Sequence, residues 1–124
     1  MNTLSVETLH AWLAEGRAVS LVDVRPAAQR AEGAIAGSLH IDAYEALWAR
    51  DPSALAELSL PRDRPVVTIC KAGKLASQVA AEQLAARGLE VFSLEGGMQA
   101  WSRAGYPTQC HPGGDTRGAR RARV

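Results

Sequence analysis

The sequence predicts an α/β fold built around a largely parallel β-sheet. Short β-branched runs alternate along the chain with segments of helical periodicity. Such alternation produces βαβ crossovers, in which the strands run in the same direction. The 124 residues are 47% hydrophobic and 22% charged, which is ordinary for one compact globular domain. The composition therefore excludes a disordered, a collagen-like or a coiled-coil chain.

The first part of the chain contains two predicted helices and one predicted strand. Ser5 can cap a helix over residues 6–15, which has an apolar face and stops at Gly16. The apolar run over 19–24 predicts a short buried strand. A short helix follows over 26–32, because the proline at its start has the backbone angle that a helix needs.

The next segment is less regular. A loop over 33–37, bounded by two glycines, leads to a short predicted strand over 38–41. Asp42 is expected to cap a helix that carries Tyr44, Leu47 and Trp48. A second helical piece is expected near 53–58.

The second half repeats the strand–helix alternation. Residues 66–70 give the strongest strand prediction, because they form a short, continuous and largely β-branched run. Residues 71–73 form a loop, and 74–87 have the periodicity of a helix that stops at Gly88. Another strand is predicted over 89–94.

The C-terminal part contains a turn at Gly96 and Gly97, a last short helix over 98–103, and a basic extension. We place a single domain at 1–108 and a flexible tail at 109–124, which lacks apolar periodicity. The tail holds four arginines and one acid, a net charge of +3, so the domain carries −2 of the total +1. It is either a solvated tail or an arm for acidic partners, and the nearly neutral total argues against a nucleic-acid-binding protein.

Nothing in the sequence indicates export or membrane insertion. The N-terminus lacks a basic segment followed by an apolar stretch, which a signal peptide needs. No apolar run approaches the roughly 18 residues of a membrane span. We therefore expect a cytoplasmic protein with no membrane contact, in which Cys70 and Cys110 are free thiols.

The residues around Cys70 favour nucleophilic chemistry. Cys70 ends a predicted strand, a short loop containing Gly73 follows, and a helix begins directly afterwards. Ligands of open α/β sheets bind at the carboxyl ends of the strands, where the loop and helix N–H groups attract anions. Lys71 and Lys74 add two positive charges. This setting favours the thiolate form of Cys70 and its reaction with an anionic substrate.

Competing motifs can be excluded by their spacing. A Walker A loop would need glycine at Thr68 and serine or threonine at Leu75. A cysteine-phosphatase or arsenate-reductase loop would need arginine at Ala76 to hold the oxyanion. The chain has no Cys-x-x-Cys pair, and the adjacent Cys110 and His111 lack further metal ligands at a usual spacing. We therefore expect neither a metal nor a cofactor.

Three stretches resemble the single-domain rhodanese (thiosulfate sulfurtransferase-like) family over about residues 4–107. They are Leu-Val-Asp-Val-Arg at 21–25 with Gly-Ala-Ile-Ala-Gly-Ser at 33–38, Cys-Lys-Ala-Gly-Lys-Leu at 70–75, and Val-Phe-Ser-Leu-Glu-Gly-Gly-Met-Gln-Ala-Trp at 91–101 with Gly-Tyr-Pro at 105–107. The third stretch is close to diagnostic for the family when it follows such a cysteine loop.

The resemblance implies a central parallel sheet with helices on both faces. It also implies a sulfurtransferase that moves sulfane sulfur through a persulfide on Cys70. The donor would be a small anion such as thiosulfate, or a low-molecular-weight or protein persulfide, and the acceptor would be cyanide or a thiol. The substrate-binding residues, through their N–H groups and charge, would be Lys71, Ala72, Gly73, Lys74 and Leu75. Asp23 and Arg25 would be buried polar supports near the site.

Three positions depart from the common family pattern. Leu75 stands where many members have arginine, Ala34 replaces the usual histidine, and Gln29-Arg30 replaces an acid–aromatic pair. The intact Cys70 favours retained chemistry, with Ala34 and Gln29-Arg30 as scaffold differences. Leu75 weakens anion binding on its side of the loop. It therefore leaves open an alternative function, a non-catalytic rhodanese-like interaction or regulatory module.

Overall fold

A five-stranded, fully parallel sheet forms the centre of the molecule, in the order β1-β5-β4-β2-β3. The computed structural model describes residues 2–110. The strands are β1 (Asn2–Leu4), β2 (Ser20–Asp23), β3 (Leu39–His40), β4 (Val66–Ile69) and β5 (Val91–Leu94). The helices are α1 (Val6–Ala14), α2 (Ala27–Glu32), α3 (Tyr44–Trp48), α4 (Leu75–Ala85) and α5 (Gly97–Arg103).

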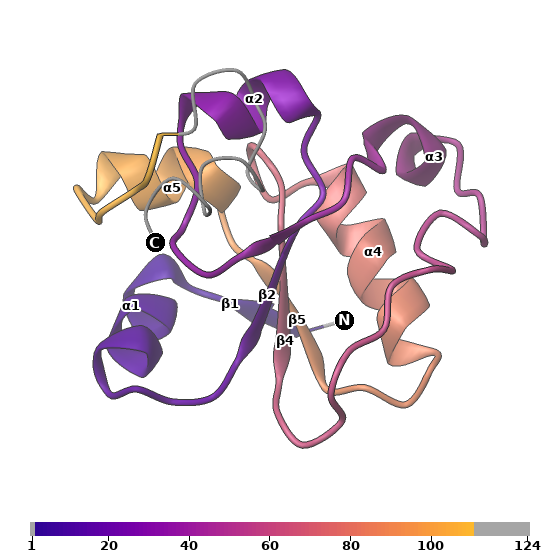
Figure 1. Ribbon diagram of the computed structural model, residues 1–124, viewed down its shortest axis with the longest axis horizontal. Helices are drawn as coiled ribbons and strands as arrows, with labels where there is room; N and C mark the ends of the chain where they lie inside the picture. Colours follow the sequence, from indigo (N-terminus) through magenta and orange to yellow (C-terminus); the bar gives the residue numbers. More distant parts are fainter. Residues whose placement is uncertain (1, 111–124) are drawn as a thin grey trace, which may run out of the picture.

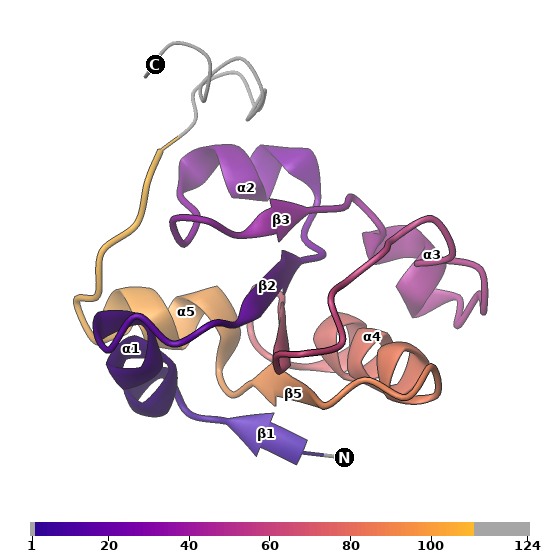
Figure 2. The same cartoon turned by 60° about the horizontal axis from the view of Figure 1, so that its bottom comes forward.

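Helices cover both faces of the sheet, which confirms the predicted fold class (Figure 1). On one face α1 and α5 bury Leu9 and Trp101 against the strands. On the other face α3 and α4 bury Leu47 and Leu84. The short α2 lies beside β3, which pairs with the last two residues of β2 near the carboxyl end of the sheet (Figure 2). Because all strands are parallel, this end collects the loops that follow β2, β4 and β5.

Several local predictions are confirmed. Ser5 accepts a hydrogen bond from the Thr8 N–H at 3.1 Å and so caps α1. All four residues of β4 are buried, as expected for a continuous apolar strand in the middle of a parallel sheet. Gly16 and Gly88 follow their helices with positive φ angles of 73° and 88°, the conformation in which glycine ends a helix most easily.

The sequence did not predict the edge strand β1. Asn2 and Thr3 are exposed and only Leu4 is buried, so the segment has no apolar run that would mark it as a strand. Its conformation depends on pairing with β5, where Asn2 lies beside Phe92 and Leu4 beside Leu94. This pairing joins segments about ninety residues apart, and local propensity does not register it.

One predicted helix and one predicted helix cap were wrong. The piece expected over 53–58 consists of turns, and the Asp51 carboxylate accepts hydrogen bonds from the Ser53 N–H and hydroxyl. Such side-chain bonds compete with helical backbone bonds. Asp42 does not cap α3, whose N-cap residue is Ala43. Instead Asp42 accepts from the N–H of Ala27, at the start of α2.

The chain contacts the domain again after α5. Gln109 forms an antiparallel bridge with Ala34, through N–H···O bonds of 2.7 and 2.8 Å. Cys110 donates a hydrogen bond to the Glu32 carbonyl at 3.2 Å. The predicted tail begins at this bridge, and its remaining residues, 111–124, lie outside the described residues. No helix within residues 2–110 has both the length and the apolar character needed to cross a bilayer.

Candidate active site

Cys70 lies directly after β4, at the carboxyl end of the sheet. Its side chain is buried, with 4% of the residue exposed. The thiol donates a hydrogen bond to the hydroxyl of Ser77 at 3.2 Å. The Ser77 hydroxyl also lies 2.9 Å from the hydroxyl of Ser93 on β5. The thiol therefore sits on a small buried polar cluster, although apolar core residues surround it.

The loop after Cys70 leads straight into α4. Lys71 and Lys74 are exposed, and Ala72 and Gly73 are half-buried between them. Lys74 is the N-cap residue of α4, and no side chain of the described residues caps this helix. Its first-turn N–H groups thus add partial positive charge beside the two lysines. Leu75 is the first residue of α4, and its side chain packs against the core.

The Gly96-Gly97 turn supports this loop from beneath. The N–H of Met98 donates to the Cys70 carbonyl and the N–H of Gln99 donates to the Lys71 carbonyl, both at 2.9 Å. A Cβ atom at Gly97 would collide with the Cys70 carbonyl and lie 2.7 Å from that of Lys71. The turn can therefore approach the cysteine loop only if residue 97 is glycine.

Gly73 is restricted from the other side. Its φ is +70°, and a Cβ atom there would lie 2.6 Å from the Gly96 nitrogen and from the Leu94 carbonyl. A side-chain amide hydrogen bond of 3.1 Å links Gln78 to the Gly73 carbonyl. Three loop carbonyls, at 70, 71 and 73, are thus bound by groups outside the loop. Their engagement fixes the loop backbone at the end of the sheet.

Asp23 and Arg25 form a buried ion pair where β2 ends. Two Arg25 nitrogens contact the Asp23 carboxylate at 2.7 and 2.9 Å. Arg25 also donates to the carbonyls of Gly33 and Gln29. Arg30 adds a second contact to Asp23 at 3.1 Å and reaches Ser38. One carboxylate and two guanidinium groups are therefore buried together.

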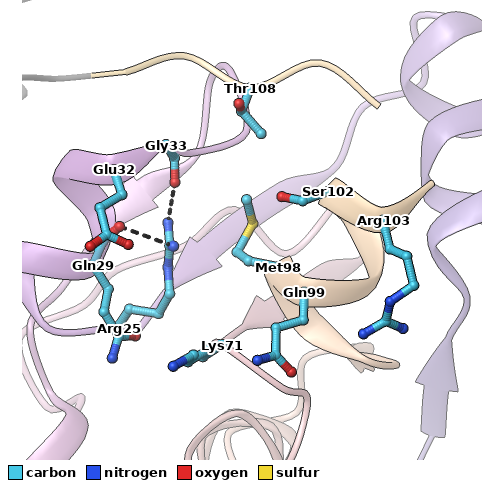
Figure 3. Close-up of a pocket in the computed structure, with 10 residues that line it drawn as sticks. All are labelled: Arg25, Gln29, Glu32, Gly33, Lys71, Met98, Gln99, Ser102, Arg103 and Thr108. Carbon is cyan, nitrogen blue, oxygen red and sulfur yellow. Dashed lines mark hydrogen bonds between the residues drawn. The ribbon is translucent and has the colours of Figure 1, made fainter. Parts of the chain in front are cut away.

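A pocket of about 620 Å³ lies beside the cysteine loop (Figure 3). Arg25 and Arg103 lie on opposite sides of it, with Lys71 and Gln99 between them. Its lining residues are Arg25, Gln29, Glu32, Gly33, Lys71, Met98, Gln99, Ser102, Arg103 and Thr108. Three of them are cationic and one is acidic, so the pocket favours an anionic ligand. Lys71 connects it to Cys70, the preceding residue.

The structure brings most of the predicted site residues to one end of the sheet. Cys70 and residues 71–75 form one loop and the start of α4. Arg25 and Lys71 line the same pocket. Asp23 lies behind Arg25 and holds it. Their roles in binding a substrate stay predictions.

Sequence reasoning missed Ser77, Ser93 and the buried role of Arg30. Ser77 adjoins Ala76 on the buried face of α4, and a hydroxyl one helical turn after the loop is the signal that could have identified it. Ser93 lies two residues after Val91 on β5, so both side chains point to the same face of the sheet, and both are buried. Arg30 was noted only as a departure from a family pattern. Its contacts with Asp23 and Ser38 depend on the tertiary fold, and no local pattern signals them.

The described residues contain no group of three His, Cys, Asp or Glu side chains that could hold a metal ion. Their reactive feature is a thiol at the carboxyl end of a parallel strand, in a cationic loop that opens a helix. This arrangement defines a class of proteins with a candidate cysteine nucleophile for anionic substrates.

Comparison with known proteins places the chain within a family of this class. Residues 5–104 match the model of the rhodanese-like domain, so the chain belongs to the rhodanese-like family. A curated sulfurtransferase of Allochromatium vinosum is 33% identical over 107 residues, which cover 86% of this chain and 94% of that protein. The thiosulfate sulfurtransferase GlpE of Ectopseudomonas mendocina is 36% identical over 96 residues, covering 77% of this chain and 80% of the relative.

Solved structures share the fold. A rhodanese-related protein from Thermoplasma volcanium superimposes with a TM-score of 0.69 at 29% identity, covering 88% of this chain and 98% of that one. A rhodanese homolog from Thermus thermophilus is 40% identical with a TM-score of 0.58, covering 81% of this chain and all of that one.

Proposed function

We propose that the protein is a rhodanese-type sulfurtransferase in which Cys70 carries sulfane sulfur as a persulfide. The observation that carries this proposal is the seating of Cys70. Cys70 directly follows β4, and an N–H group of α5 binds its carbonyl. A cationic loop comes next, and then a helix start that no side chain among residues 2–110 caps. Membership of the rhodanese-like family, with relatives named sulfurtransferases, supports the same reading.

The first half-reaction takes sulfur from the donor. The Cys70 thiolate attacks the outer sulfur of thiosulfate, a new S–S bond forms, and the bond between the two thiosulfate sulfurs breaks. Its electron pair leaves with sulfite. The enzyme then carries a Cys70 persulfide anion. Total charge is conserved, because a thiolate and a dianion become a persulfide anion and a dianion.

The second half-reaction returns the thiolate. Cyanide or a thiolate attacks the outer persulfide sulfur, and Cys70 leaves as the thiolate. The products are thiocyanate or a persulfide of the acceptor. A low-molecular-weight or protein persulfide can replace thiosulfate as the donor by the same exchange. A cytoplasmic location belongs to this proposal, because a reducing compartment keeps the thiol free between turnovers.

Charge around the loop favours such donors. Lys71 and Lys74 are exposed on either side of Gly73, and Arg25 and Arg103 line the adjacent pocket. The outer persulfide sulfur, which bears the negative charge, would lie among the N–H groups of the loop and of the first turn of α4. The two lysines and two arginines supply the positive charge that many family members have from an arginine at the position of Leu75.

Burial of Cys70 limits what can react with it. Only 4% of the residue is exposed, so a donor or acceptor has to present a slender terminal atom. The outer sulfur of thiosulfate, the carbon of cyanide and a thiol sulfur at the end of a side chain all meet this condition. A bulky or branched sulfur donor does not.

Intact-mass measurement tests the proposal. We expect thiosulfate to add one sulfur atom to the protein, peptide mapping to place it on Cys70, and cyanide to remove it. Cys70→Ser should accept none, whereas Cys110→Ser should load like the unmodified chain. If folded protein gains no cyanide-labile sulfur at Cys70 from thiosulfate or a persulfide donor, the proposal is wrong. The non-catalytic module then becomes the better description.

A further inference from the structure

We propose that Ser77, supported by Ser93, is a positioning residue that stabilises the Cys70 thiolate by donating a hydrogen bond to it. This inference rests on the proposed function, because a thiolate at Cys70 begins and ends each sulfur transfer. It assigns a role to two residues that lie outside the cysteine loop, one on α4 and one on β5.

Three buried polar atoms lie in a row beneath the loop. The Cys70 sulfur is 3.2 Å from the Ser77 hydroxyl, which is 2.9 Å from the Ser93 hydroxyl. Ser77 is fully buried and Ser93 is 1% exposed. Because water does not cover these hydroxyl groups, their hydrogen bonds act in a medium of low polarity, where bonds to a charged atom are strong.

The hydrogen bonds along this row can reverse their donor–acceptor direction without the movement of a heavy atom. In the thiol form, Cys70 donates to Ser77, and the Ser77 proton is directed to Ser93 or to the Lys74 carbonyl, 3.5 Å away. Once the thiol proton is lost, the sulfur can only accept. The Ser77 hydroxyl then turns its proton toward the sulfur, and Ser93 donates to Ser77. Two hydroxyl rotations thus replace the reorientation of solvent.

This support is selective for the thiolate. In the persulfide, the inner Cys70 sulfur is bonded on both sides and the negative charge lies on the outer sulfur. The Ser77 bond is therefore worth more before and after sulfur transfer than in the loaded state. It favours departure of Cys70 when an acceptor attacks, because a better stabilised thiolate leaves faster.

A purely structural role for Ser77 makes a different prediction. Ser77 also joins α4 to the sheet, since its carbonyl accepts a 2.8 Å hydrogen bond from the Thr68 hydroxyl. If the Ser77 hydroxyl only helped packing, its removal would lower stability and leave the ionisation of Cys70 unchanged. Charged groups also lie on the segments around the loop. They are Lys71 and Lys74 on the loop, Asp23 and Arg25 from the end of β2, and Glu95 and Arg103 from the β5–α5 side. The variants below leave all six in place.

The experiment is a pH titration of the thiolate by its ultraviolet absorbance in the full-length protein, with Cys70→Ser as the baseline. This reading needs no reagent to reach the buried sulfur. We expect Ser77→Ala to move the midpoint upward by about one pH unit, roughly tenfold in the ionisation equilibrium. Ser93→Ala should move it in the same direction by less, and Ser77→Thr, which keeps the hydroxyl, should stay near the unmodified protein.

Thr68→Val is the matched control. It removes one buried hydroxyl from the same contact between α4 and the sheet, and it leaves the Ser77 hydroxyl in place. Its midpoint should match the unmodified protein. An unchanged midpoint in Ser77→Ala, or an equal shift in Thr68→Val, overturns the proposal. If Ser77→Ala does not fold, Ser93→Ala decides, and an unshifted midpoint there counts against it.

Sulfur loading separates this inference from the proposed function. If the unmodified protein takes no sulfur, the sulfurtransferase proposal fails, whereas the titration still reports whether Ser77 stabilises the thiolate. If the unmodified protein loads normally and the midpoints do not move, only the role of Ser77 is overturned. Turnover should follow the midpoints, with a lower kcat for thiol acceptors in Ser77→Ala and a smaller change in KM.

Discussion

Cys70 and Cys110 carry the same thiol in opposite surroundings. Cys70 is buried at the end of a central strand and contacts the Ser77 hydroxyl. Cys110 is exposed in the segment after α5 and contacts the Glu32 carbonyl. A carbonyl accepts a thiol hydrogen bond but cannot donate one to a thiolate, whereas a hydroxyl can do both. The comparison shows that position in the fold, rather than exposure, distinguishes a candidate nucleophile.

The largest expected effect separates the two thiols directly. Cys70→Ser should lower kcat/KM for sulfur transfer from thiosulfate to cyanide by on the order of a thousandfold or more, because the attacking atom is lost. Cys110→Ser should keep kcat/KM within about twofold, since changes at exposed positions away from a site are small. Steady-state assays of both variants measure this. Equal losses in the two variants would contradict the distinction.

The next effect concerns how each thiol is supported. Gly97→Ala should destabilise the protein by at least about 2 kcal/mol and reduce sulfur loading, because its φ of +57° disfavours a side chain and its Cβ would displace the cysteine loop. Gly105→Ala is the matched control on the segment that leads to Cys110. Its φ is +80°, and nothing lies within 4 Å of an added Cβ.

Urea unfolding and sulfur loading are the measurements for this glycine pair. For Gly105→Ala we expect only the backbone cost, about 1 kcal/mol, and normal loading. If both variants lost loading equally, the contact between the Gly96-Gly97 turn and the loop would not explain how Cys70 is held.

A smaller effect tests the charge around Cys70. The double variant Lys71→Gln/Lys74→Gln should raise KM for thiosulfate about three- to tenfold at low salt, and added salt should narrow the difference. Arg62→Gln removes a charge near the amino end of β4, in a separate pocket with Arg17 and Pro65, and should leave KM unchanged. Kinetics at two ionic strengths measure both. An unchanged KM in the double variant would show that the lysines are only solvated.

The smallest effect is on stability. Cys110→Ser should change the free energy of unfolding by less than about 0.5 kcal/mol, because it alters an exposed atom. Urea titration of both cysteine variants checks this. Cys70→Ser should lower the free energy of unfolding more, because it replaces a buried sulfur by a more polar oxygen. A large loss in Cys110→Ser would show that the bridge between Gln109 and Ala34 depends on this thiol.

The main part of the site, the loop at Cys70, could be predicted from the local sequence. The loop that starts at Cys70 is contiguous with its strand and its helix, so periodicity and one glycine were enough to place it at the end of the sheet. Ser77 and Ser93 are sixteen residues apart. They meet only because α4 packs on the sheet beside β5, and no local pattern reports that crossing. The edge strand β1 was missed for the same reason, because its neighbour in the sheet, β5, is about ninety residues away in the sequence.

The buried charged cluster around Asp23 could be predicted only in part. The family resemblance implied that Asp23 and Arg25 are buried polar supports, and both side chains are buried. The place of Arg30 in the same cluster depends on the fold of the short loop around Ser38. A sequence reading does not show which of several arginines a buried carboxylate will bind.

The most direct test of the central claim follows one sulfur atom. Thiosulfate with an isotopic label in its outer sulfur is mixed with the protein, and the label is located by peptide mass spectrometry before and after cyanide is added. We predict label on Cys70 in the first sample, and in the second an unlabelled Cys70 with labelled thiocyanate. Labelled thiocyanate formed without label on Cys70, or label held only on Cys110, would contradict a persulfide cycle at Cys70.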